Sequence, residues 1–189
     1  MKPISGFKTE APRAAYPMLP KGLYTAGIKA VKVEGAEPDQ RLVIRLEIIN
    51  GDWAGYYTKR YQNDAASGGR FEAKYKGDYS LQIPDQANPK RQHYDWDYRS
   101  FNNAIWAIED SNPGYHWDWN EQGLVGKTVG INVRQGSYNG NPYTTIGRLE
   151  STQMMAAGKC KLMKDMEPRG DATQVTTTTE MVVDEEVPF

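Results

Sequence analysis

The chain has 189 residues, 39% of them hydrophobic, and a formal net charge of −1 at pH 7. Its mean hydropathy of −0.73 and the absence of an apolar run near the ~20 residues that a membrane span needs argue against a membrane protein. The single cysteine, Cys160, excludes an internal disulfide and a cysteine-rich zinc site. Because the N-terminal residues also lack the apolar run of a signal peptide, we expect a cytoplasmic protein.

Three strands are predicted in the first third of the chain, after an extended proline-containing arm at residues 1–20. Residues 23–34 alternate apolar and polar side chains, and residues 41–50 do so most clearly. A tight turn at residues 51–55 leads into residues 56–62, where aromatic and basic side chains predict a third strand.

The rest of the chain is predicted to hold one helix and two further strands. Residues 63–98 show no sustained period and are interpreted as an insertion. Ser100 is a plausible N-cap for a helix that ends near Ser111. Strands are expected at 127–138 and 143–154, joined by an Asn-Gly-Asn-Pro turn, and residues 158–189 are expected to form a disordered acidic tail.

This order predicts an all-β domain with one main helix at residues 21–157. A helix between the third and fourth of five strands is the order of the OB-fold, a small, partly open barrel that binds oligonucleotides. Non-specific binding of single-stranded DNA requires cations for the phosphates and flat rings on which the bases stack.

The predicted third strand carries both kinds of group. Tyr57, Lys59 and Tyr61 would share its outer face, and Trp53 would project from the preceding turn. The polar face of the second strand adds Arg41 and Arg45. Packing against a neighbouring strand is the alternative role for each of these tyrosines.

The last predicted hairpin lies where an OB-fold closes a loop over its ligand. Its candidate contacts are Arg134, Tyr138, Tyr143 and Arg148, with an ordinary polar turn as the alternative. A second aromatic concentration surrounds the helix, and we interpret it chiefly as structural packing, with Trp106 in the core. Its other members are Tyr94, Trp96, Tyr98, Tyr115, Trp117 and Trp119.

The sequence does not predict an enzyme. His93 and His116 are isolated, with no neighbouring residues at metal-ligand spacing, and no glycine-rich phosphate loop or activated nucleophile is recognisable. We therefore expect no catalytic residue, cofactor or metal.

The C-terminal end differs in charge from the rest of the chain. Residues 166–189 contain six acids and one base, which leaves 22 bases and 18 acids in the first 165 residues. The chain ends in a tip of three acids, one apolar residue, a proline and a phenylalanine: Asp184, Glu185, Glu186, Val187, Pro188 and Phe189. An aromatic ring beside a free carboxylate suits a partner pocket with a basic rim. The tail could also fold back on an empty DNA groove.

Several segments together resemble single-stranded DNA-binding proteins of phages and mobile elements of Gram-positive bacteria. They are Leu-Pro-Lys-Gly-Leu-Tyr at 19–24, the run from Leu46 to Lys59, residues 101–114, residues 124–130 and the acidic tip. The resemblance implies an OB-fold, single-stranded DNA binding in replication or recombination inside the host cytoplasm, and recruitment of replication proteins by the tip. The insertion leaves open whether the protein forms a homo-oligomer. Alternatives are a strand-annealing recombination mediator and a β-domain that binds a protein or carbohydrate through exposed aromatic residues.

Overall fold

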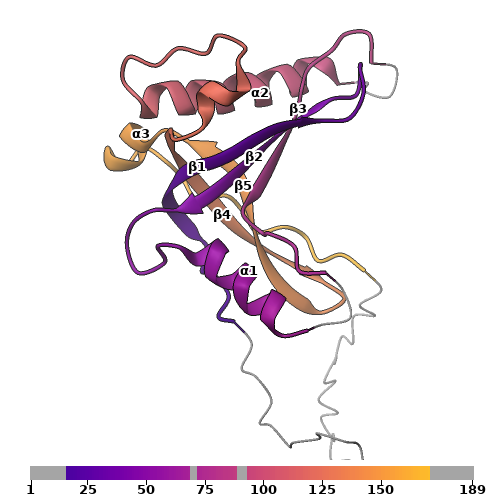
Figure 1. Cartoon of the computed structure of the whole chain (residues 1–189), viewed down its shortest axis with the longest axis vertical. Helices are drawn as coiled ribbons and strands as arrows, with labels where there is room; N and C mark the ends of the chain where they lie inside the picture. The colour runs from indigo at the N-terminus through magenta and orange to yellow at the C-terminus, as the bar shows by residue number, and fades with distance from the viewer. Residues whose placement is uncertain (1–15, 69–71, 89–92, 171–189) are drawn as a thin grey trace, which may run out of the picture.

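The structure is a computed structural model that describes residues 16–68, 72–88 and 93–170. It is mainly β, with one five-stranded antiparallel sheet in the order β3-β2-β1-β4-β5. Helix α2 lies across one end of the sheet and helix α1 at the other (Figure 1). The sheet is not closed, because its outer strands β3 and β5 do not pair with each other.

Strand β1 (Gly22–Glu34) connects the two halves of the sheet. Its first half pairs with β4 (Thr128–Tyr138) and its second half with β2 (Arg41–Ile48), and a register shift separates Ile28 from Ala30. An extra residue of this kind bends a strand and increases its twist, which lets the sheet curl around its apolar side. Ile28 and Ile44 are fully buried on that side.

Four of the predicted strands are present, with shifted ends. Strand β5 (Asn141–Glu150) follows β4 through the Asn139-Gly140 turn, in which both residues adopt a positive φ. It is followed by a short helix, α3 (Thr152–Ala156). The hairpin prediction is therefore confirmed, with the second strand starting two residues earlier and ending four residues earlier than expected.

The predicted third strand was wrong, because residues 56–62 belong to a helix, α1 (Tyr56–Ala66). Tyr56 and Tyr57 are buried, Arg60 is half-buried, and the other faces of the helix are exposed. This is the one-sided burial of a surface helix. The true third strand is β3 (Asp78–Gln82), within the segment interpreted as an insertion.

The main helix begins earlier than predicted. Helix α2 spans Tyr94–Ser111, so Ser100 lies inside it and is not its N-cap. Two acids, Asp95 and Asp97, stand in its first turn, where negative charge favours a helix start. Phe101, Ala104, Ile105 and Ile108 face the core as predicted, together with Leu124 of a 3-10 turn, η1 (Glu121–Leu124).

A buried carboxylate on β2 fixes the start of α1. Glu47 accepts hydrogen bonds from the backbone N–H groups of Tyr57 (3.0 Å) and Thr58 (2.7 Å), and also from the hydroxyls of Thr58 and Tyr75. Gly55, which stands at the N-cap position of α1, supplies no side-chain cap. Glu47 therefore performs the N-cap role from a different element.

Residues 158–170, here called the strap, run along the β4–β5 hairpin. The Asn132 side chain accepts from the N–H of Met163 (3.2 Å) and donates to the carbonyl of Lys161 (2.9 Å). Beyond the end of β1, the strap pairs with the edge of β4: the N–H of Met166 donates to Gln135 and that of Arg169 to Ser137. These residues were expected in a disordered tail, but the hydrogen bonds continue to Arg169.

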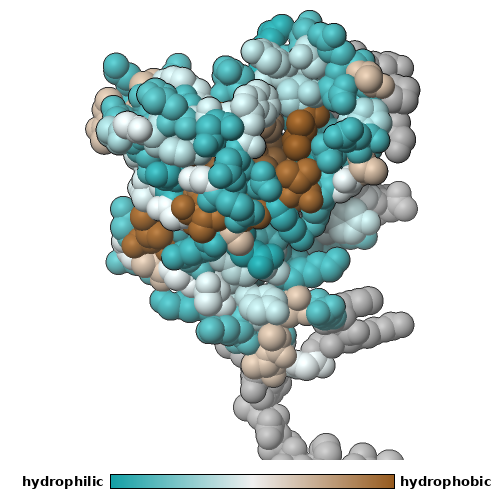
Figure 2. Space-filling view, turned by 45° about the horizontal axis from the view of Figure 1, so that its top comes forward, coloured by the Kyte–Doolittle hydropathy of each residue, from teal (hydrophilic) through white to brown (hydrophobic). Residues whose placement is uncertain are grey.

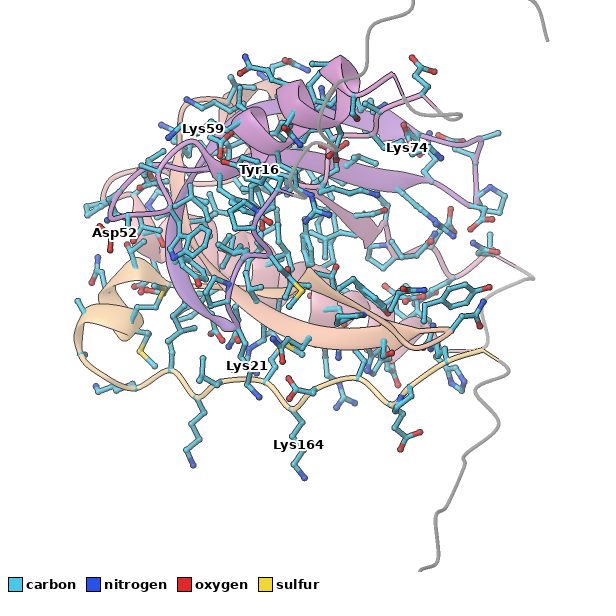
Figure 3. The ribbon with its side chains drawn as sticks, turned by 90° about the horizontal axis from the view of Figure 1, so that it is seen from below. Tyr16, Lys21, Asp52, Lys59, Lys74 and Lys164 are labelled. Atoms are coloured by element: carbon cyan, nitrogen blue, oxygen red, sulfur yellow. The ribbon has the colours of Figure 1, made fainter. Side chains whose placement is uncertain are left out.

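Every third strap residue faces the sheet. Cys160, Met163 and Met166 are half-buried, whereas the residues between them are exposed. Lys164 points away from the sheet (Figure 3). This spacing matches neither the alternation of a strand nor the period of a helix, which is why periodicity did not reveal the strap.

We predict that Glu47→Gln lowers the free energy of unfolding by about 1.5–3 kcal/mol, the range for hydrogen bonds to charged groups. Each carboxylate oxygen accepts from a backbone N–H, so the amide nitrogen of glutamine would face a donor in either orientation. Chemical denaturation monitored by circular dichroism measures the change. Glu34→Gln, at an exposed residue that forms an ion pair with Lys32, is the control and should change the free energy by less than about 0.5 kcal/mol. Equal effects of both variants would contradict the cap.

We also predict that Asn132→Ala releases the strap. The Met163 N–H of the strap would lose its acceptor, and the Lys161 carbonyl would keep only the hydrogen bond from Arg148. Amide hydrogen exchange in 160–170 should accelerate roughly tenfold or more. Asn102→Ala, at an exposed position of α2, should leave this exchange unchanged. Unprotected strap amides in the unaltered protein would refute the packing described above.

Candidate nucleic-acid interface

A groove separates the unpaired edges of β3 and β5. Its volume is about 490 Å³, and α2 and the strap complete its walls. Fourteen residues line it: Arg41, Tyr79, Ser80, Leu81, Gln82, Trp96, Asp97, Ser100, Asn103, Ala104, Gly147, Arg148, Leu149 and Met163. We call it the β3–β5 groove.

Two predicted cations, Arg41 and Arg148, meet in this groove although 107 positions separate them in the sequence. Arg41 belongs to β2 beside the β3 edge, and Arg148 belongs to β5. The Arg148 guanidinium donates to the Glu150 carboxylate and to the Lys161 carbonyl (3.2 Å). These bonds fix its position, while its side chain stays 48% exposed and accessible to a ligand.

Arg134 lies close to the same site. Its side chain passes close to Gly147. A Cβ atom added to Gly147 would lie 3.2 Å from the Cδ atom of Arg134. Burial raises the pKa of the Tyr79 hydroxyl, and the nearby positive charges of Arg134 and Arg148 partly oppose this rise. Three of the predicted arginines therefore gather around the gap between β3 and β5.

Two buried polar atoms here have no hydrogen-bond partner among the residues that the structure describes: Oε1 of Gln82 and Nε of Arg134. Unpaired buried polar groups are costly and rare in folded proteins. One is an acceptor and the other a donor.

Arg45, Tyr61 and Tyr75 form a second cluster, here the Arg45 cluster. Arg45 forms a bidentate ion pair with Asp78 (2.8 and 3.0 Å) and lies over the Tyr75 ring, 4.8 Å from its centroid. The hydrogen bond that Arg45 donates to Asp78 raises the pKa of Arg45. Tyr61 is 40% exposed and 6.2 Å from Tyr75. Tyr61 and Arg45, both predicted DNA contacts, therefore lie against the same ring, Tyr75.

Other predicted contacts are structural in this fold. Tyr57 is only 4% exposed, so it cannot stack on a base. Trp53 is half-buried and packs edge-on against Tyr56 at 5.5 Å. Lys59 donates to the Ala54 carbonyl at the start of its own helix (2.9 Å). The prediction that Tyr57, Lys59 and Tyr61 share one face was wrong because the segment is helical.

The β4–β5 hairpin presents one of its two predicted tyrosines. Tyr138 is exposed near the turn. Tyr143 instead lies over Gly136, which has no side chain to block the ring, and its hydroxyl is 3.7 Å from the sulfur of Met166. The predicted partner-binding tip, 184–189, lies outside the described residues.

The structure also identifies residues that the sequence analysis did not select. Tyr79 was missed although Asp-Tyr-Ser-Leu-Gln has the alternation of a strand. Trp96 was assigned to packing but is 67% exposed, and Trp106, expected in the core, is 48% exposed. Trp96 lies in the first turn of α2, whose start the sequence analysis placed seven residues too late. Trp106 lies off the helix face that Ala104, Ile105 and Ile108 bury.

Polar residues cover most of the face shown in Figure 2, and apolar patches interrupt them only locally. Within 16–68, 72–88 and 93–170 no cluster of three or more His, Cys, Asp or Glu residues is arranged to hold a metal ion. No helix of the described part is long and apolar enough to cross a membrane. No family model and no curated protein matches the chain.

We predict that Tyr57→Ala lowers the free energy of unfolding by about 3–5 kcal/mol, as truncation of a buried aromatic residue does. The ring packs against Tyr56 and Tyr75 and lies over Gly77. Tyr61→Ala, which removes a more exposed ring, should cost less than about 1.5 kcal/mol. Thermal and urea unfolding compare the two. A similar small loss for both variants would show that Tyr57 is not a core residue.

Proposed function

We propose that this protein is an OB-fold, single-stranded DNA-binding protein that coats single strands without sequence preference. The observation that carries the proposal is the groove between β3 and β5, where Arg41 and Arg148 stand beside the exposed Trp96. Cations together with exposed rings are what such binding requires.

The strand order supports the OB-fold assignment. In a five-stranded OB barrel, closure would bring the third strand beside the fifth, and these are the two outer strands here. The main helix lies between the third and fourth strands, as the fold requires. Helix α1 is then an addition between the second and third strands.

The distribution of the two clusters supports a path for the DNA. OB-folds bind oligonucleotides across the second and third strands and between the loops after the first and fourth. Arg41 and Arg45 share one face of β2, about 13 Å apart at ~3.3 Å per residue. A strand could therefore extend from the groove to the Arg45 cluster, with Tyr138 at the hairpin end.

The tip would contribute separately from this surface. In this proposal, residues 184–189 recruit replication or recombination proteins, because three acids followed by Val-Pro-Phe offer a charged and apolar peptide hook. Deleting them should preserve single-stranded DNA affinity while removing partner binding.

Titration of intrinsic tryptophan fluorescence with oligo-dT tests the function. Binding to dT, with much weaker binding to duplex of equal length, is expected at low salt. The double variant Arg41→Ala/Arg148→Ala should weaken binding and reduce the magnitude of the salt slope by about 1.4, since each phosphate contact on a single strand contributes about 0.7.

The matched control is Lys127→Gln. This cation lies over the Tyr115 ring, near the C-terminal end of α2 and outside the groove. It should leave affinity and salt slope unchanged. No response of the folded protein to dT at low salt would overturn the function. Equal effects of the arginine and lysine variants would instead show that the groove is not the site.

A further inference from the structure

The N-terminal turns of α2 carry a depression that adjoins the β3–β5 groove. His93, Tyr94, Asp95, Trp96 and Arg99 line it, and its volume is about 340 Å³. Trp96 lines the groove as well. One indole ring therefore forms a shared wall between the two concave surfaces.

Trp96 is unusually exposed for a residue of this size. Its side chain keeps 67% of its surface accessible, and no ring contact of Trp96 is present among the described residues, whereas Tyr94 and Tyr98 pair at 6.1 Å. A large ring without a packing partner contributes little to folding. It is available as a stacking platform.

The charges around Trp96 indicate which part of a nucleotide would bind there. Arg99 and Asp95, which line the depression together with His93, carry opposite charges that balance each other. The groove on the other side has two cations, Arg41 and Arg148, against one acid, Asp97. A phosphate would favour the groove, whereas an uncharged, flat base would favour the balanced depression.

We infer that Trp96 is a base-stacking residue that extends the single-stranded DNA site from the β3–β5 groove onto helix α2. This inference rests on the proposed function. A strand whose phosphates lie beside Arg41 and Arg148 would place one base on the indole and direct the following nucleotides toward the Tyr94–Tyr98 pair.

The test uses the full chain and fluorescently labelled oligo-dT of graded length, measured by anisotropy at several salt concentrations. Trp96→Ala should weaken binding of the longer oligomers by about 5- to 150-fold, the range that corresponds to one lost stacked base. The salt slope should stay the same, because no phosphate contact is lost. Trp96→Phe, which keeps a flat ring, should recover most of the affinity.

Trp106→Ala is the matched control, since this tryptophan lies on the same helix, is 48% exposed and does not line the groove. It should bind dT normally. If the unaltered protein binds dT and Trp96→Ala binds equally well, the inference fails and the proposed function stands. Equal losses for both tryptophan variants would also overturn it. If the unaltered protein does not bind dT, the proposed function itself fails.

Discussion

The carboxylate of Glu47 is the interaction on which the arrangement of this fold depends. It is buried on β2, yet it holds the first turn of α1 and the hydroxyl of Tyr75. A buried charge is tolerated only when hydrogen bonds replace its lost hydration, and here backbone donors do so. The chain therefore forms a helix, and not a strand, as the next element after β2. That helix keeps Tyr56 and Tyr57 in the core and delays the third strand until Asp78.

The β3–β5 groove follows from the late position of the third strand, which begins only at Asp78. Strand β3 has 5 residues whereas β5 has 10, and these two outer strands do not pair. Met163 of the strap and Trp96 of α2 stand at the gap between them. The open edge is thus lined with side chains, among them Arg41 and Arg148. The β3–β5 groove therefore depends on the lengths of the elements around it as much as on the identity of the residues that line it.

The sequence predicted most of the sheet because its signals are local. Alternation in β1, β2 and the last hairpin requires only neighbouring residues, and the Asn-Gly turn fixes its own geometry. Residues 56–62 were misassigned because tyrosines favour strands, while the cap that makes them helical comes from Glu47, which lies 10 and 11 positions before the N–H groups that it accepts. The same limit applies to the site: Arg41 and Arg148 were selected separately, but only the fold brings them together. Trp96 was undervalued because exposure is a tertiary property.

The strap has a mechanical consequence for whatever follows it. The N–H of Asn139, in the β4–β5 turn, donates to the carbonyl of Arg169 (2.9 Å), and Gly170 lies against the Asn139 side chain. The end of the strap is therefore attached to the turn and to the last residues of β4 beside it. Because of these contacts, any displacement of that turn would also move residue 170. A ligand that moves the hairpin would thus reposition the origin of the remaining 19 residues, without touching them.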